Sequence, residues 1–179
     1  MMFLFSAATS LLQYIGDPEE LAALVYWMFG SLSKASWSTF QITFIVVLIT
    51  ILVAYRWSWD LNSLMLGDES AKSTGIDVDR LRISSLALAS MTTAVIISLL
   101  GPIGFIGLVA PHLGRIIIGG DHRFLILVAS LLGAILLVLA DSIARTILAP
   151  VVIPVGIITS FVGVPLLIYL MIRRRKEHW

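Results

Sequence analysis

Long apolar runs separated by short polar segments organise this chain of 179 residues. A helix that crosses a bilayer needs about 20 mainly apolar residues, and fewer when neighbouring helices shield it. Residues 1–15 form an apolar run that is long enough for only part of a span. The pattern predicts an all-α integral membrane bundle with a partial N-terminal span and about five full spans. The runs that predict full spans are 42–55, 83–100, 103–118, 124–143 and 151–172.

Composition supports the same class. Hydrophobic residues make up 59% of the chain and charged residues 13%, with a mean hydropathy of +1.01. Soluble domains are nearer half apolar and a quarter charged. The sequence contains no cysteine, which excludes disulfides, thiolate metal sites and thiol nucleophiles. Residues 1–15 lack a basic start and a clear cleavage site, so we expect no signal peptide.

Residues 17–30 carry a helix-start signal. Asp17 stands at the N-cap and Pro18 at the first helical position, and Glu19 and Glu20 follow in the first turn. The Tyr and Trp of this segment suit a membrane interface. We therefore predict a short helix lying near the membrane surface.

The longest polar segment, residues 57–82, predicts two short amphipathic helices. Asp68 is expected to cap a helix over residues 69–74, which ends at a left-handed Gly75. Asp77 is expected to cap a second short turn before the next apolar run. Two such helices are too small for a domain but fit a groove on a partner protein, and an ordinary solvated loop is the alternative.

Lysine and arginine are divided unevenly between alternate connections, with only Lys34 and Arg145 on the poorer side. The positive-inside rule predicts a multi-pass protein of the cytoplasmic membrane with a cytoplasmic C-terminus. Arg115 then lies about a turn before a cytoplasmic connection, where its side chain can reach water. Any polytopic helical protein shows such a bias, so it does not identify a function. The richer side holds Arg56, Lys72, Arg80, Arg82, Arg115, Arg123, Arg173, Arg174, Arg175 and Lys176.

The sequence lacks the usual patterns of catalytic and metal sites. His112, His122 and His178 have no His or carboxylate partner at metal-ligand spacing, and neither H-E-x-x-H nor Gly-x-Ser-Gly occurs. We therefore predict no catalytic residue, no metal site and no cofactor, and we do not expect an enzyme. His112 is interpreted as a packed histidine, hydrogen-bonded to backbone that Pro111 leaves free, with a proton relay as the alternative.

Glycine and proline interrupt the apolar runs in residues 104–123 and 150–165. Small residues allow close helix packing, whereas proline removes a helical hydrogen bond. Tight packing is the simpler interpretation, and a broken helix that lines a transport pathway is the alternative. The candidate pathway residues are Gly104, Pro111, His112, Arg115, Pro154, Gly156, Gly163 and Pro165.

Five gapped motifs follow one another along the chain: "LVYWMFGSL", "LMLGDESAKSTGIDVDRLR", "GPIGFIGLVAPHLGRIIIGGDHR", "LLGAILLVLADSIAR" and "IPVGIITSFVGVPLLIYLMIRRR". Together they resemble the permease family of bacterial and archaeal ABC importers for cobalamin, ferric siderophores and haem. Family members are roughly twice as long and have ten spans. The resemblance therefore implies that residues 1–179 are the C-terminal half of one transmembrane domain. Many members carry Glu where Val152 stands here.

The resemblance also implies partners. The protein would be a homodimeric permease in membrane lipid, with no nucleic-acid partner, and ATP would be hydrolysed on a separate ABC ATPase subunit. Arg145 would meet a Glu of an extracytoplasmic substrate-binding protein. The loop that would dock on the ATPase includes Gly67, Asp68, Glu69, Ser70, Ala71 and Gly75.

The rival interpretation is a stand-alone small polytopic protein, either a secondary transporter or a structural membrane partner. A secondary transporter is expected to bury coupling carboxylates within a span. Asp141 is the only carboxylate near a span interior, and Arg145 follows it at the predicted outer end. An intrahelical pair between Asp141 and Arg145 is the alternative to docking by Arg145.

Overall fold

The computed structural model describes residues 2–33 and 35–175, and all regular elements within these ranges are helices. The predicted all-α class is therefore confirmed. Lys34, Lys176 and His178 lie outside the described residues. In chain order the helices are α1 (Met2–Ile15), α2 (Pro18–Met28), α3 (Trp37–Arg56), α4 (Ser58–Leu64), α5 (Asp68–Ser73), α6 (Val78–Leu100), α7 (Ile106–Ile118), α8 (His122–Thr146) and α9 (Val155–Arg175).

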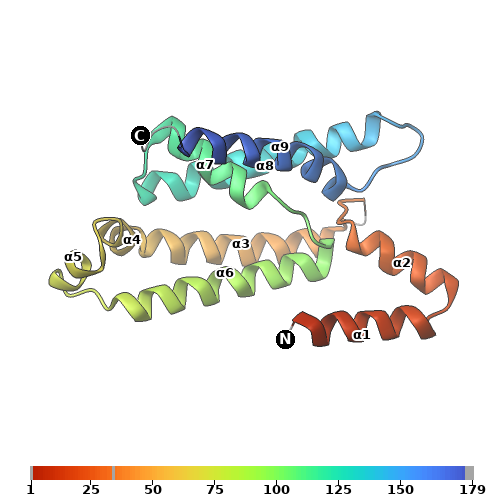
Figure 1. The fold of residues 1–179 in the computed structure, drawn as a ribbon, viewed down its shortest axis with the longest axis horizontal. Coiled ribbons are helices and arrows are strands. Elements are labelled where there is room, and N and C mark those ends of the chain that lie inside the picture. The colour runs from red at the N-terminus through yellow and green to blue at the C-terminus, as the bar shows by residue number, and fades with distance from the viewer. Residues whose placement is uncertain (1, 34, 176–179) are drawn as a thin grey trace.

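The helices form two layers (Figure 1). α3 and α6 make an antiparallel pair, which the Thr50 and Thr92 hydroxyls join by a hydrogen bond of 2.6 Å. α7, α8 and α9 make the second layer, and α8 links the layers because it packs along α7 and also contacts α3. α1 and α2 project from one end of the bundle.

Among the described residues, α3, α6 and α8 are long and apolar enough to cross a membrane by length and composition. Phe40, Leu52 and Leu131 on these helices are each more than half exposed, as lipid-facing side chains are. Shorter apolar helices cover Phe3–Ile15, Ile106–Ile118 and Val155–Ile168. The apolar helices of a membrane bundle are thus confirmed, and the number of five full spans stays a prediction.

Polar caps start the long helices earlier than the apolar runs predict. The Ser36 hydroxyl accepts the Thr39 backbone N–H at 3.2 Å, so α3 includes the polar residues before its apolar run. Asp77 Oδ1 accepts the Arg80 backbone N–H at 3.0 Å, which confirms Asp77 as a cap. The helix that Asp77 starts is the continuous α6, so the prediction of a separate short turn is wrong.

α2 confirms the short helix predicted after Asp17. Pro18 is its first residue, and Asp17 stands at the N-cap, although its side chain makes no capping hydrogen bond. The position of α2 relative to a membrane surface stays a prediction.

Two prolines lie within continuous helices, Pro111 in α7 and Pro165 in α9. Proline cannot donate the backbone hydrogen bond of an inner helical position, but both helices continue beyond it. The alternative interpretation, a helix broken at Pro111 or Pro165, is therefore wrong, and a place for these residues on a pathway stays a prediction. The chain is interrupted instead between α8 and α9, and Pro154 is the last residue of that interruption.

Candidate functional site

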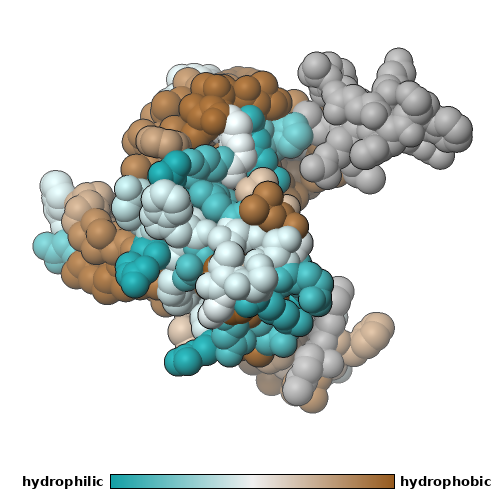
Figure 2. Space-filling model, turned by 90° about the vertical axis from the view of Figure 1, so that its left-hand side faces the viewer, coloured by the Kyte–Doolittle hydropathy of each residue, from teal (hydrophilic) through white to brown (hydrophobic). Residues whose placement is uncertain are grey.

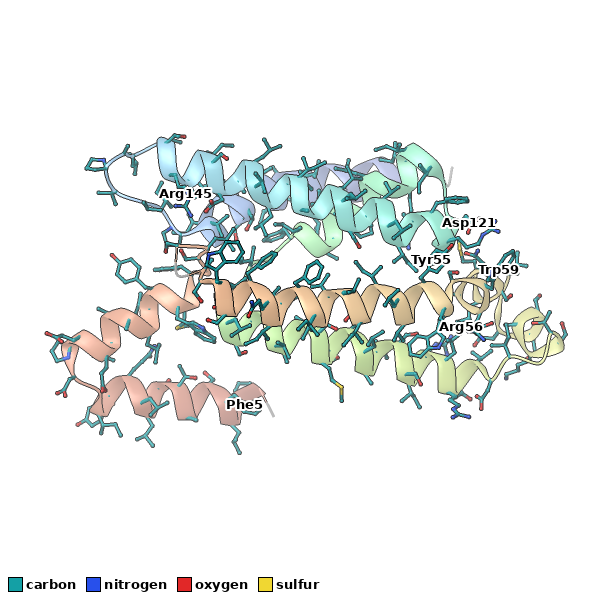
Figure 3. The ribbon with its side chains drawn as sticks, turned by 180° about the vertical axis from the view of Figure 1, so that it is seen from behind. Phe5, Tyr55, Arg56, Trp59, Asp121 and Arg145 are labelled. Carbon is teal, nitrogen blue, oxygen red and sulfur yellow. The ribbon has the colours of Figure 1, made fainter. Side chains whose placement is uncertain are left out.

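Hydrophilic residues gather at one end of the bundle. α4, α5 and the α7–α8 turn lie there, together with the described end of α9 (Figure 1). Figure 2 faces this end and shows hydrophilic surface between hydrophobic flanks. Arg56 and Asp121 lie at this end, and Arg145 lies at the opposite one (Figure 3). The predicted placement of Arg56 and Arg145 on different sides matches the fold, and which side is cytoplasmic stays a prediction.

α5 is a short helix set between two glycines. Gly67 has φ 104°, a conformation that favours glycine, and it occupies the N-cap position. Asp68 is therefore the first residue of α5, so its predicted role as a cap is wrong, and it pairs with Arg82 of α6 at 3.1 Å. Gly75 has φ 84° and follows the helix as the predicted left-handed exit.

The faces of α5 differ sharply in exposure. Ala71 is fully buried against the protein, since α5 contacts both α4 and α6. Glu69, Ser70 and Ser73 are exposed. Helical geometry places Glu69 and Ser73 roughly opposite Ala71, with Ser70 beside them. The face of α5 that a partner can reach is therefore the one with Glu69, Ser70 and Ser73. Ala71 packs on the opposite side, against the protein.

Asn62 of α4 binds the start of α8. Its Nδ2 donates to Asp121 Oδ1 at 2.8 Å, and its Oδ1 accepts the backbone N–H of His122 at 2.8 Å. Asp121 also caps α8 by accepting the Arg123 backbone N–H at 3.0 Å. The Arg123 guanidinium pairs with Asp121 and lies 4.2 Å from the centre of the Trp59 ring on α4. We call these five residues the α4–α8 clamp.

The hydrogen bonds of the clamp favour the ionised form of Asp121. The Arg123 side chain, and after it the Asn62 amide, hold the pKa of Asp121 well below its ordinary value. The carboxylate therefore stays charged at neutral and mildly acidic pH. An Asp before an apolar run is a local signal for a cap, so the sequence carries a signal for the capping role of Asp121. No local signal points to Asn62, which is 59 residues away from Asp121.

A mainly apolar surface cavity of about 680 Å³ lies toward the opposite end of the helices. Its walls come from the end of α2 and the residue after it, the segment between α6 and α7, and α9. Three predicted pathway residues, Gly104, Gly156 and Pro165, are among its lining residues. The others are Met28, Phe29, Pro102, Ile157, Ser160, Phe161 and Val164.

Three glycines let backbone segments cross beside this cavity. A Cβ at Gly156 would collide with the carbonyl oxygen of Phe29, and a Cβ at Gly30 or Gly101 would also meet a backbone oxygen. Gly30 and Gly101 have φ of 67° and 77°, which disfavours any other residue. The Gly156 N–H donates to the Gly30 carbonyl at 3.2 Å. Sequence reasoning selected Gly156 and missed Gly30 and Gly101, because their crossing is a long-range contact.

The other predicted pathway residues do not line the cavity: Pro111, His112, Arg115, Pro154 and Gly163. Gly163 packs so closely on Phe105 that a Cβ would collide with its side chain. His112 is half-buried and has no hydrogen bond from its side chain among the described residues, so its predicted bond to the backbone is wrong. Arg115 is exposed near the end of α7, as access to water requires.

Arg145 pairs with Asp141 one turn earlier on α8, with 2.7 Å between Arg145 Nε and Asp141 Oδ2. The predicted intrahelical pair is thus present. The Arg145 side chain is still 46% exposed, which leaves part of the guanidinium open to a partner. An exposed i,i+4 pair of this kind contributes little to stability because solvent screens it, so a partner carboxylate can replace it at little cost.

The two ends offer binding surfaces. In the part of the chain that the structure describes, no group of three or more His, Cys, Asp or Glu side chains could hold a metal ion. One end presents the short helix α5 and the ion pair between Arg123 and Asp121. The other end presents the apolar cavity and Arg145. Such surfaces can bind partner proteins and an apolar ligand.

Comparison with known proteins gives consistent matches over nearly the whole chain. A putative ABC transporter permease protein of Methanocaldococcus jannaschii is 47% identical over 177 residues, which cover 99% of this chain and 51% of the relative. The hemin transport system permease protein HmuU of Yersinia pestis is 41% identical over 174 residues, which cover 97% of this chain and 52% of the relative. The chain thus spans about half the length of the curated relatives it matches.

A solved structure described as an inward-facing conformation of a putative metal-chelate type ABC transporter has the same fold. The TM-score is 0.87 at 36% identity, and the match covers 95% of this chain and 55% of the other. The FecCD transport family matches residues 1–173. The two relatives above are named as permeases, in agreement with the prediction that this chain is not an enzyme. The chain belongs to the FecCD transport family.

Proposed function

We propose that this chain is the C-terminal half of a permease subunit in a binding-protein-dependent ABC importer. The match of the FecCD transport family to residues 1–173 carries the proposal. Helix α5 also supports the proposal. It lies at the polar end, in the connection from the apolar helix α3 to the apolar helix α6, and a short exposed helix suits a groove on a partner. In this proposal the polar end is cytoplasmic and binds a separate ABC ATPase.

The cargo is a metal chelate, such as a ferric siderophore or haem, or a corrinoid such as cobalamin. The Yersinia pestis relative is named for hemin, and the matching structure for a metal chelate. The apolar cavity of about 680 Å³ supports a bulky, partly apolar cargo, since ligand sites are concave and mainly apolar. A second copy of the permease completes the pathway in the membrane.

A stand-alone secondary transporter or structural membrane partner fits the chain less well. A secondary transporter needs a carboxylate that binds the coupling ion within the membrane. Asp141 is the best candidate for such a carboxylate, but it already forms an ion pair with Arg145. The importer needs no such group, because ATP hydrolysis supplies the driving force.

The cargo class is tested by the ATPase activity of the assembled transporter in proteoliposomes. Hemin, a ferric siderophore and cobalamin are each loaded on the binding protein, and the rate of ATP hydrolysis is compared with that for the empty binding protein. We expect one class to stimulate hydrolysis. Equal rates for all three loaded forms and the empty form would contradict the proposed cargo.

Replacing Arg145 with Glu is expected to weaken the binding protein's association with the permease. The substitution places two acidic groups together at the proposed docking pair, and this repulsion is strongest at low salt. Surface plasmon resonance at two ionic strengths measures it, and we expect the loss of affinity to shrink as salt rises. Normal affinity at low ionic strength would assign Arg145 to its helix pair alone. Ser142→Ala is the matched control, because Ser142 hydrogen-bonds only within α8.

A further inference from the structure

The α4–α8 clamp uses both polar groups of one amide. Asn62 donates from Nδ2 to Asp121 and accepts at Oδ1 from the His122 backbone, each at 2.8 Å. The two partners are the N-cap and the first residue of α8, so Asn62 closes the start of that helix from a different element. Replacing it removes one of the donors to the Asp121 carboxylate, which keeps its bonds from Arg123, and leaves the His122 backbone N–H without this acceptor.

A second contact keeps α4 in the same orientation. Trp59 stands one turn before Asn62 on α4, and the Arg123 guanidinium lies 4.2 Å from its ring centre. A cation over an aromatic face is attracted to it, and Arg123 is also bound by Asp121. α4 therefore holds α8 at two points on one face, which opposes both sliding and rotation.

The elements on either side of the clamp are themselves closely packed. α5 is seated on α4 and α6 through the fully buried Ala71. α8 packs along α7, where Gly114 allows the side chain of Leu125 to approach. Phe105, at the start of α7, presses on Gly163 of α9, next to the cavity residue Val164. Contacts thus continue from α5 through the clamp to the wall of the cavity.

We propose that Asn62 is a positioning residue that fixes the α4–α5 unit to α8, so that displacement of α5 moves α8 and α7 with it. The proposal rests on the proposed docking of the ATPase at α5. It adds the residue through which movement at the polar end reaches the helices beside the cavity. Asn62 touches neither ATP nor cargo in this role.

The first experiment compares uptake with ATP hydrolysis in the assembled transporter. Asn62→Ala is expected to lower cargo moved per ATP hydrolysed by about tenfold, because hydrogen bonds to a charged group are lost. Co-purification of the ATPase is expected to stay normal, since the exposed face of α5 is intact. Ser63→Ala is the matched control, because the Ser63 hydroxyl bonds only to the Trp59 carbonyl within α4. An unchanged ratio in Asn62→Ala would overturn the proposal.

A charge exchange separates positioning from general damage. Asn62→Asp places a second carboxylate beside Asp121 and is expected to impair the ratio at least as much as Asn62→Ala. Adding Asp121→Asn restores the pair with its direction reversed, because the residue-121 amide then donates to the residue-62 carboxylate, which also accepts the His122 backbone N–H. We expect most of the ratio to return. Failure of the second substitution to restore it would overturn the proposal. A wild-type transporter without ATP-driven uptake would instead refute the proposed function.

Spin-label distances test the attachment without reference to uptake. The chain contributes no cysteine, so Lys72→Cys on α5 and Phe124→Cys on α8 give two labels at exposed positions. With Asn62 present, we expect one narrow distance distribution that is the same with and without ATP. Asn62→Ala is expected to broaden it. A distance that shifts with ATP while Asn62 is present would show that the two elements move separately, and would overturn the proposal.

Discussion

Gly156→Ala is expected to destabilise the protein by about 3 kcal/mol, because the added methyl group has no space beside a rigid backbone oxygen. Its Cβ would collide with the carbonyl oxygen of Phe29, and the Gly156 N–H is also bonded to Gly30. Neither backbone segment can turn aside as a flexible side chain would. The apparent melting temperature in detergent measures the loss, and we expect it to fall by several degrees.

Gly107→Ala is the matched control. Gly107 is the second residue of α7, as Gly156 is the second residue of α9, but a Cβ there meets no atom within 4 Å. Alanine also favours a helix over glycine by up to about 1 kcal/mol. The control is therefore expected to be neutral or slightly stabilising. Equal melting temperatures for the two variants would contradict the crossing of backbones at Gly156.

Ser70→Trp is expected to remove the ATPase from the permease during affinity purification. Ser70 is exposed on α5, so an indole there projects away from the permease. It would fill the space in which the groove of the ATPase is proposed to receive α5. Loss of one well-packed contact in an interface weakens binding by roughly 100-fold. Insertion in the membrane and the melting temperature of the permease alone are expected to stay unchanged. Normal recovery of the ATPase would remove α5 from the docking role.

The buried neighbour of Ser70 provides a contrasting variant. Ala71 is fully buried, so Ala71→Trp forces α5 away from α4 and α6 and is expected to lower the melting temperature as well as ATPase recovery. Ser70→Ala is the conservative control and is expected to retain the ATPase. The melting temperature distinguishes the two tryptophan variants, because only Ala71→Trp is expected to lower it. Loss of the ATPase from the stable Ser70→Trp variant therefore tests docking directly.

Local signals predicted several helix starts well. Asp77 caps α6 and Pro18 begins α2, because capping and proline placement depend only on neighbouring residues. Asp68 was predicted wrongly as a cap, since the positive φ of Gly67 shifts the helix start by one residue. Short-range patterns therefore fix which segments are helical better than they fix the role of each polar residue at the ends.

Features that depend on tertiary contact were not accessible from sequence. Proline suggested breaks at Pro111 and Pro165, but packing against α8 and other helices keeps α7 and α9 continuous. The partners of Asn62 and of Gly156 come from remote segments, so no spacing rule reveals them. The resemblance to a permease family implies that the loop around α5 docks on an ATPase. The structure adds which residues of that loop are exposed and that Ala71 is buried.

Uptake by the assembled transporter after ion gradients have been collapsed distinguishes an ATP-driven importer from a secondary transporter. Proteoliposomes containing the permease, its ATPase and a loaded binding protein are treated with ionophores, and cargo uptake is measured with ATP and with a non-hydrolysable analogue. We expect uptake with ATP that ionophores do not reduce, and no uptake with the analogue. Uptake that needs an ion gradient and proceeds without ATP hydrolysis would contradict the proposed function.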